Sequence, residues 1–139
     1  MIKIQVLDEV ARPTRGHYTD AGIDLKNTKP IKLEPGKSTK VLFGIKTSFP
    51  TGYVGLVFPR SGLGSKGLRL KNTVGVIDSD YRGELMGFIE NTGDKEIELE
   101  AGSRIAQLVV VPCLFGDIQF VNELRSTDRG EKGFGSTGV

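Results

Sequence analysis

The sequence has little of several residue types on which common enzymes depend. Its 139 residues include one cysteine, Cys113, one histidine, His17, and no tryptophan. A single cysteine excludes an internal disulfide, and the apolar run around it predicts a buried, inert thiol. A single histidine leaves no His-rich metal site and argues against a Ser-His-Asp triad. Any catalysis is therefore expected from carboxylates, cations, hydroxyls and backbone amides.

The sequence also lacks a large excess of charge of one sign, and it lacks long apolar runs. Lysine and arginine total 19 against 17 acidic residues, a formal net charge of +2, which argues against stable binding to nucleic acid or to an acidic membrane. No run approaches the ~20 apolar residues that a membrane-spanning helix requires, and the first residues do not resemble a signal or transit peptide. We expect a soluble intracellular protein, cytoplasmic or nuclear, with no membrane partner.

What the chain does contain is a series of short apolar or alternating runs, cut by Gly and Pro turns every ~8–12 residues. They predict strands within residues 2–7, 31–49, 52–59, 73–78, 83–91, 95–114 and 117–122. The stretch 61–70 has room for one short helix, weakened by its glycines. The pattern is typical of an all-β sandwich or barrel. We expect one barrel domain over residues 1–125 and a flexible, Gly-rich flap over residues 126–139.

The stretch FPRSGLGSKG, residues 58–67, follows one of the predicted strands. Its Arg60, Ser61 and Gly62 would let a cation, a hydroxyl and backbone N–H groups face one anion. An ordinary strand-to-loop turn has the same composition, so this stretch alone leaves both interpretations open.

The stretch NTVGVIDSDYRGE, residues 72–84, predicts a hairpin with Asp78, Asp80 and Tyr81 near its tip. An aspartate is already ionised at neutral pH and can activate a water molecule. A solvated acidic turn is the alternative. A calcium loop is disfavoured, because no bidentate glutamate follows at the required spacing.

Two further stretches carry weaker signals. Asp24 lies among apolar residues in AGIDLKN, in a predicted strand, where an inward carboxylate would need an arginine or a metal-bound water as its partner. An outward-facing aspartate would give the same pattern. Gln107 and Arg104, in SRIAQLVV, alternate with apolar neighbours and are ambiguous by themselves.

The final stretch, TDRGEKGFGSTGV, holds four glycines, the cations Arg129 and Lys132, and one aromatic residue, Phe134. A frayed terminus is one interpretation. A lid is the other, because glycine lets the backbone approach a polyphosphate while Phe134 stacks on a flat ring. A solvent-exposed tail gains nothing from a large aromatic side chain, which favours the lid.

Five stretches together, AGIDL, PRSGLGSKG, GVIDSDYRGE, RIAQLVV and RGEKGFGSTG, resemble the five motifs of the trimeric dUTPase family in order and spacing, from about Ala21 to Gly138. The resemblance implies a jelly-roll β-barrel and a homotrimer whose active sites each take parts from three subunits. It implies Mg²⁺-assisted hydrolysis of dUTP to dUMP and pyrophosphate. Such an activity limits uracil incorporation into DNA and supplies dUMP for thymidylate synthesis.

Matched position by position, the resemblance implies that Asp78 activates the water that attacks the α-phosphorus. It implies that Tyr81 packs under the deoxyribose and excludes a 2′-hydroxyl, and that Asp24 acts on the metal only indirectly, through water, or through an arginine. The residues implied for the uracil edge are Asn72, Gly75, Val76, Ile77 and Met86. Those implied for the phosphates and the closing flap are Arg60, Ser61, Gly62, Gln107, Arg129, Phe134, Gly135, Ser136 and Thr137, with Phe134 over the uracil.

The chain departs from the family pattern at Lys132, where glycine is usual, and at Gly64, where alanine is common. A dCTP deaminase of the same fold is an alternative, because Glu90 lies in FIEN, on the strand where those enzymes carry a catalytic glutamate. The DSDY sequence and the complete fifth motif favour the hydrolase. A nucleotide-binding protein without turnover, and a structural jelly roll without a ligand, are further alternatives.

Overall fold

The structure is a computed structural model and describes residues 1–133. Over these residues the chain is almost entirely β, with one 3-10 turn, η1 (Glu9–Ala11), and one four-residue helix, α1 (Ser61–Gly64). The eleven strands are β1 (Lys3–Val6), β2 (Ile23–Lys26), β3 (Ile31–Leu33), β4 (Ser38–Leu42), β5 (Ile45–Ser48), β6 (Tyr53–Pro59), β7 (Leu68–Leu70), β8 (Gly75–Ile77), β9 (Met86–Asn91), β10 (Ile97–Leu99) and β11 (Arg104–Pro112). No helix in the described part is long and apolar enough to cross a membrane.

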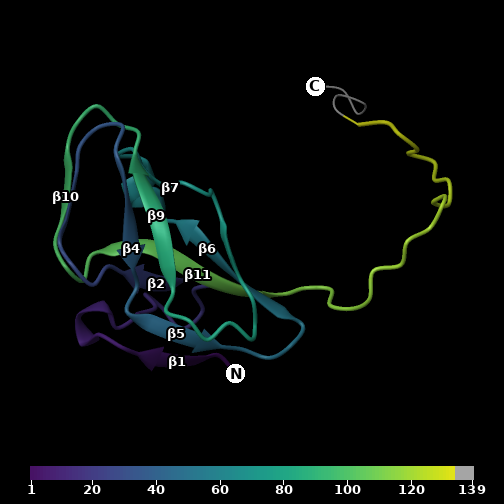
Figure 1. Ribbon diagram of the computed structural model, residues 1–139, viewed down its shortest axis with the longest axis horizontal. Helices are drawn as coiled ribbons and strands as arrows, with labels where there is room; N and C mark the ends of the chain where they lie inside the picture. The colour runs from purple at the N-terminus through teal and green to yellow at the C-terminus, as the bar shows by residue number, and fades with distance from the viewer. Residues whose placement is uncertain (134–139) are drawn as a thin grey trace.

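The strands form four short antiparallel sheets around one interior (Figure 1). Their orders are β2-β11-β6-β8, β4-β9-β7, β1-β5 and β3-β10. The nine-residue β11 is central to the largest sheet, because it pairs with β2 on one side and with β6 on the other. This arrangement brings three of the predicted motifs, AGIDL, PRSGL and RIAQLVV, into adjacent strands.

The core is filled by the inward residues of these strands. Successive side chains of a strand point to opposite faces, so the alternation in the sequence becomes one buried and one exposed face. In β5, for example, Ile45 and Thr47 are buried while Lys46 and Ser48 are partly exposed. Phe43, Leu25, Leu85 and Leu108 are fully buried, and burying each such side chain contributes about 1.5–3 kcal/mol.

The connection between β8 and β9 differs from the predicted hairpin. β8 pairs with β6, whereas β9 pairs with β4 and β7, so the two strands belong to different sheets. The intervening residues 78–85 turn a corner between sheets, and that connection is longer than the two to five residues of most hairpin loops. We call residues 72–86 the corner segment.

The chain leaves the barrel after β11. The N–H of Cys113 donates to Gly52 O at 2.9 Å, and among the described residues no later backbone group bonds to the barrel. Every residue from 113 to 133 is exposed, and we call this stretch the arm; it extends away from the strands in Figure 1. Cys113 is therefore exposed, so the prediction of a buried thiol was wrong for this chain.

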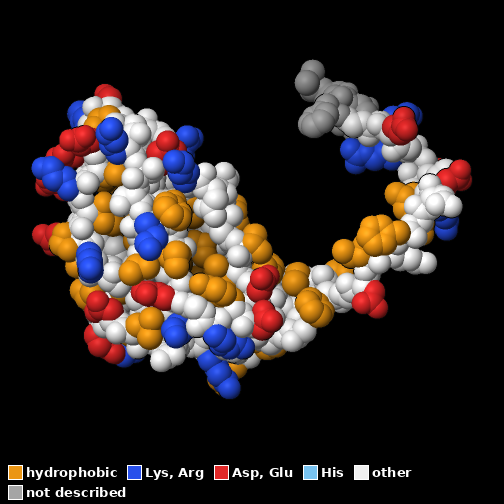
Figure 2. Space-filling view, in the orientation of Figure 1, with side chains coloured by type: hydrophobic (Ala, Val, Ile, Leu, Met, Phe, Trp, Pro, Cys, Tyr) orange, Lys and Arg blue, Asp and Glu red, His pale blue; other side chains and the backbone are white. Residues whose placement is uncertain are grey.

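The arm also overturns the predicted strand at 117–122, which is absent from the described elements. A strand needs a neighbouring strand to pair with, and among the described residues none pairs with the arm beyond Cys113. It carries large apolar side chains that stay more than half exposed, visible as an orange row in Figure 2: Leu114, Phe115, Ile118, Phe120, Val121 and Leu124. The chain thus departs from the barrel at Cys113, earlier than residue 126, and the division into a 1–125 barrel and a flap stays a prediction.

Candidate active site

Three of the predicted motifs converge on the buried carboxylate of Asp24 in β2. Arg60 Nε, at the end of β6, lies 2.8 Å from Asp24 Oδ1, and Arg104 Nη1, at the start of β11, lies 3.6 Å from Oδ2. The inward carboxylate therefore has two arginine partners. Removing one partner of a buried ion pair is strongly destabilising, so each group holds the others in place.

Gln107 connects the same three strands. It lies opposite Asp24 in β2 and opposite Phe58 in β6, and its Nε2 donates to Pro59 O at 3.1 Å. A Cβ at Gly22 would collide with the Gln107 side-chain oxygen, so the glycine of AGIDL makes room for this amide. The amide and the PRSGL turn are thereby fixed relative to each other.

These residues line a cavity of about 400 Å³, which we call the Asp24 pocket. Its lining comprises Gly16, Asp20, Ala21, Gly22, Asp24, Arg60, Ser61, Arg104 and Gln107. Both aspartates are engaged, since Asp20 accepts the N–H of His17 at 2.8 Å. α1 begins at the lining residue Ser61 without a side-chain cap, and the N–H groups of Leu63 and Gly64 donate to Arg60 O, which leaves those of Ser61 and Gly62 to offer to a ligand. The pocket therefore offers guanidinium, amide, hydroxyl and backbone donors to an anion.

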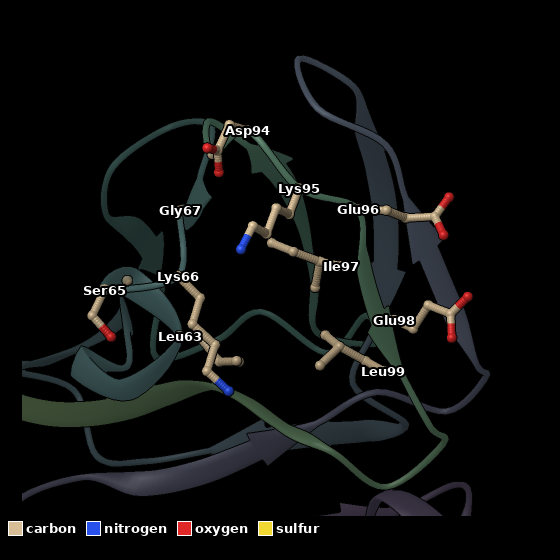
Figure 3. Close-up of a pocket in the computed structure, with 12 residues that line it drawn as sticks. Leu63, Ser65, Lys66, Gly67, Asp94, Lys95, Glu96, Ile97, Glu98 and Leu99 are labelled. Carbon is tan, nitrogen blue, oxygen red and sulfur yellow. The ribbon is translucent and has the colours of Figure 1, made fainter.

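A larger hollow, of about 680 Å³, lies beside α1 between that helix and β10 (Figure 3). Glu96 and Glu98 point away from it and pair with Lys32, each at 3.1 Å. The hollow gathers none of the predicted catalytic or uracil-binding residues, so size alone does not identify the site.

Asp78 is exposed to solvent in the corner segment, on a turn that several hydrogen bonds hold in place. Arg82 Nη1 donates to Ser79 O at 2.9 Å and to Tyr81 O at 3.0 Å, and it reaches Thr47 O at 3.4 Å. The N–H of Tyr81 donates to Asp78 O at 3.2 Å. The Asp78 carboxylate itself forms no ion pair among the described residues, which leaves it free to bind a water molecule.

The Tyr81 ring is held by its own turn. Its hydroxyl donates to Glu84 O at 3.3 Å, and a Cβ at Gly83 would collide with the ring. Glu84 Oε1 in turn accepts the N–H of Gly44 at 3.0 Å, which ties the turn to the barrel. These roles of Arg82, Gly83 and Glu84 could not be predicted from the sequence, because they depend on contacts across the corner.

Within one chain, Asp78 and the Asp24 pocket are far apart. The register pairs Ile77 with Gly55, so Asp78 lies level with Val54, near the start of β6. Arg60 is six residues further along the same strand direction. At a rise of about 3.3 Å per residue, the separation is about 20 Å. The structure therefore brings Asp24, Arg60, Ser61 and Gln107 together but does not bring Asp78 or Tyr81 to them.

The remaining predicted residues fall into two groups. Those of the corner segment, Asn72, Gly75, Val76, Ile77 and Met86, lie on or beside β8 and at the start of β9. Arg129 lies in the arm, where its Nε donates to Lys132 O at 3.0 Å. The arm as a whole extends away from the barrel in Figure 1. Phe134, Gly135, Ser136 and Thr137 lie outside the described residues.

A family model described as dUTPase matches residues 8–138. The chain belongs to the dUTPase family. A deoxyuridine 5'-triphosphate nucleotidohydrolase of Corynebacterium jeikeium (strain K411) is 48% identical over 144 residues, which cover 99% of this chain and 93% of that protein.

Solved dUTPase structures share the fold. The dUTPase of Staphylococcus bacteriophage 80alpha with dUPNHPP superposes with a TM-score of 0.89 at 35% identity, covering 100% of this chain and 99% of the phage protein. A mutant dUTPase of S. aureus phage phi11, studied for the coordination of a structural Mg(II) ion, is 30% identical with a TM-score of 0.82 and covers 91% of this chain and 99% of its own. The predicted dUTPase-like jelly-roll barrel is thus confirmed.

Proposed function

We propose that this chain hydrolyses dUTP to dUMP and pyrophosphate, through attack of an Asp78-activated water on the α-phosphorus. The observation that carries the proposal is the convergence of Arg60, Ser61 and Gln107 around Asp24, beside an uncapped helix start. Family membership and relatives named for this reaction support the same substrate.

The phosphates bind in the Asp24 pocket, to Arg60, Ser61, Gly62 and Gln107. Asp24 orients Arg60 through the 2.8 Å ion pair, so that the guanidinium's remaining N–H groups are available to the ligand. The pocket's two arginines are balanced by two aspartates, so its own side chains are far from neutralising a triphosphate with about four negative charges. Further cations must come from outside the pocket.

A magnesium ion would supply part of the missing positive charge. Within residues 1–133 no three His, Cys, Asp or Glu side chains are grouped to hold a metal, and both Asp24 oxygens face arginines. Magnesium commonly keeps several waters and binds through substrate phosphates, with one or two carboxylates nearby. Asp24 would therefore contact it through water. When bound, the ion offsets phosphate charge before the anionic nucleophile approaches.

The corner segment supplies uracil recognition and Asp78, the carboxylate that activates the attacking water. Asn72, Met86 and the backbone of Gly75, Val76 and Ile77 contact the uracil edge, and a narrow pocket there leaves no room for the 5-methyl group of thymine. Backbone groups matched to uracil leave the amino group of cytosine unpaired, and such mismatches are rejected strongly. Tyr81, fixed by Glu84 O, packs under the deoxyribose and excludes a 2′-hydroxyl.

The distance between Asp78 and the Asp24 pocket supports a homotrimer with shared sites. A triphosphate cannot be held at Arg60 and attacked beside Asp78 of the same chain across about 20 Å. A neighbouring subunit that brings its corner segment to the Asp24 pocket removes the problem. Closed rotational symmetry then completes equivalent sites on every subunit.

The arm supports the same assembly. Its six large apolar side chains lie in solvent in the single chain, and each gains about 1.5–3 kcal/mol on burial. A neighbouring barrel is the surface that covers them, and the arm then carries residues 126–139 to another subunit's site. There Arg129, Ser136 and Thr137 contact phosphates, Phe134 stacks on uracil, and Gly135 permits the close approach.

A substrate panel tests the proposed function. Purified protein with Mg²⁺ is given dUTP, dTTP, dCTP or UTP, and pyrophosphate and ammonia are measured. We expect pyrophosphate from dUTP alone. Ammonia from dCTP would establish a deaminase, although Glu90 is engaged by Arg69 at 3.4 Å. Tight dUTP binding without pyrophosphate would indicate a sensor. If a non-hydrolysable dUTP analogue leaves the melting temperature unchanged, the barrel does not bind this nucleotide, because a ligand at 100 times its Kd adds about 2.7 kcal/mol to the free energy of unfolding.

A further inference from the structure

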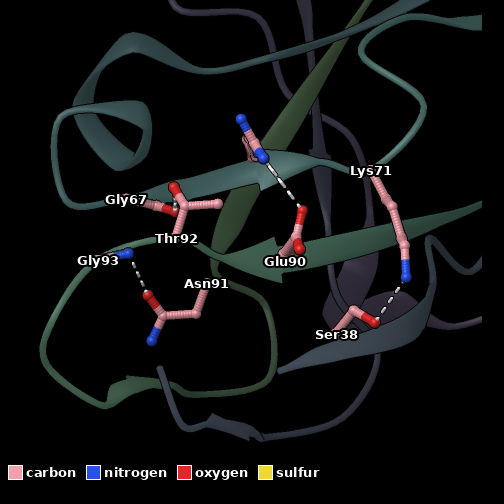
Figure 4. A network of polar contacts seen from close by, with 8 residues as sticks. Ser38, Gly67, Lys71, Glu90, Asn91, Thr92 and Gly93 are labelled. Atoms are coloured by element: carbon pink, nitrogen blue, oxygen red, sulfur yellow. Dashed lines mark hydrogen bonds and ion pairs between the residues drawn. The ribbon is translucent and has the colours of Figure 1, made fainter. Parts of the chain in front are cut away.

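The loop that follows β6 is closed by a contact with the turn between β9 and β10. We call residues 60–67 the phosphate loop and residues 91–93 the β9–β10 turn. The carbonyl of Gly67 accepts both the N–H of Thr92 at 2.8 Å and its Oγ1 hydroxyl at 2.9 Å (Figure 4). Two donors from one residue therefore hold the last residue of the phosphate loop.

Gly67 packs too closely for any side chain. Its φ is +88°, in the left-handed region, and a Cβ would lie 2.5 Å from Gly93 N and 2.8 Å from Gly93 Cα. Those atoms are backbone, so a rotamer change cannot relieve the collision. Alanine at this position must displace either the phosphate loop or the β9–β10 turn.

The β9–β10 turn is the more rigid of the two partners. Asn91 is 0% exposed, and its Nδ2 donates to Leu33 O at 2.9 Å and to Lys95 O at 2.8 Å. Its Oδ1 accepts the N–H of Gly93 at 3.0 Å (Figure 4). A buried side chain with all of these bonds satisfied resists movement, so a collision at Gly67 displaces the phosphate loop instead.

The phosphate loop is also held to the barrel near its start and at Leu63, whose partly buried side chain packs on the core. Arg60 pairs with Asp24 and also reaches Arg104 O at 3.4 Å. Between Arg60 and Gly67 the loop is largely exposed, and a Cβ at Gly62 or Gly64 would meet open space. The backbone bonds of the helical turn join these anchors, so the angle at which Ser61 and Gly62 present their donors depends on the contact at Gly67 as well as on those at Arg60 and Leu63.

We propose that Thr92 and Gly67 are positioning residues that hold the phosphate loop in its binding geometry, although neither touches the substrate. The inference rests on the proposed function, because it assigns the triphosphate to Ser61 and Gly62. Displacement of the loop weakens contacts made to the β- and γ-phosphates in both ground and transition states. Loss of such uniform binding raises KM more than it lowers kcat.

Gly67→Ala tests the contact, with Gly64→Ala as its matched control in the same loop. We expect Gly67→Ala to raise the KM for dUTP by about tenfold or more, with a smaller change in kcat, because a displaced loop loses charge-assisted hydrogen bonds. Inhibition by a non-hydrolysable triphosphate analogue should weaken far more than inhibition by dUMP, which lacks the outer phosphates. Gly64→Ala should leave KM, kcat and inhibition by both compounds unchanged.

Thr92→Val and Thr92→Ser separate the hydroxyl bond from general stability. Valine keeps the shape and the backbone N–H but removes the hydroxyl donor, so we expect KM to rise by about twofold to fivefold. Serine retains the donor and should restore the wild-type KM. If Gly67→Ala and Thr92→Val lower the melting temperature while KM stays unchanged, the contact is merely structural and the inference is wrong. Wild-type protein that fails to cleave dUTP would refute the proposed function instead.

Discussion

Sharing of the active site can be measured by mixing two inactive variants. The first, Asp78→Asn, keeps its flap but lacks the carboxylate that we propose activates water. The second ends after Asp128, so it keeps Asp78 and the apolar arm residues up to Leu124 but lacks flap residues 129–139. Each variant alone should be close to inactive.

The expected recovery follows from the geometry of the site. Asp78 lies about 20 Å along β6 from Arg60 of its own chain, and the arm leaves the barrel at Cys113. In the proposed homotrimer, we therefore expect the carboxylate and the flap of one site to come from different chains. In a random one-to-one mixture, half of the carboxylate donors and half of the flap donors are intact. About one quarter of the sites are then complete in closed trimers.

The assay is pyrophosphate release after the two variants are co-expressed with different tags and the mixed trimers are purified. Separately purified trimers combined without subunit exchange serve as the control and should remain inactive. Recovery near one quarter of the wild-type rate supports shared sites. No recovery in verified mixed trimers would refute the reasoning, because it would mean that Asp78 and the flap of one site belong to the same chain.

Two further predictions concern residues that hold the site together. Asp24→Asn leaves two arginines facing each other, so we expect the free energy of unfolding, measured in a urea titration, to fall by about 2–3 kcal/mol. This is less than the ~3–5 kcal/mol of a fully buried pair, because both arginines are partly exposed. The exposed control Asp94→Asn should change stability little, and equal stability of both variants would contradict the role of Asp24 in holding the arginines. Gly83→Ala displaces the Tyr81 ring, so the preference for dUTP over UTP, measured as a ratio of kcat/KM values, should fall about tenfold. An unchanged ratio would show that the ring does not read the sugar.

The positions of the strands could be predicted from the sequence more reliably than the pairing between them. Alternation along β4, β5 and β10 marked half-buried strands, because one face of each packs on the core. It could not show that β8 pairs with β6 instead of β9, since strand pairing depends on contacts distant in sequence. The short strand β7 was missed because its three residues follow the glycines of the phosphate loop. The left-handed Gly67 ends the helical turn there and redirects the chain into the sheet.

For the candidate site, the residue types in the sequence indicated the chemistry, but the sequence could not show how the side chains are arranged in space. The PRSGL and AGIDL stretches indicated an anion and an inward carboxylate, but the partners of Asp24 follow from the β2-β11-β6 register. The predictions of a strand at 117–122 and of a buried Cys113 were wrong for a related reason. Both depend on a surface to pack against, and residues 1–133 of the single chain do not supply one.

The most direct measurement compares wild-type protein with Asp78→Asn in two experiments on the same preparation. One follows pyrophosphate release from dUTP with Mg²⁺, and the other follows binding of a non-hydrolysable dUTP analogue. A group that acts as a general base contributes about 10²–10⁴ to the rate, so kcat should fall at least a hundredfold while the Kd for the analogue stays within about threefold. Turnover that survives in Asp78→Asn would contradict the assignment of the water-activating carboxylate.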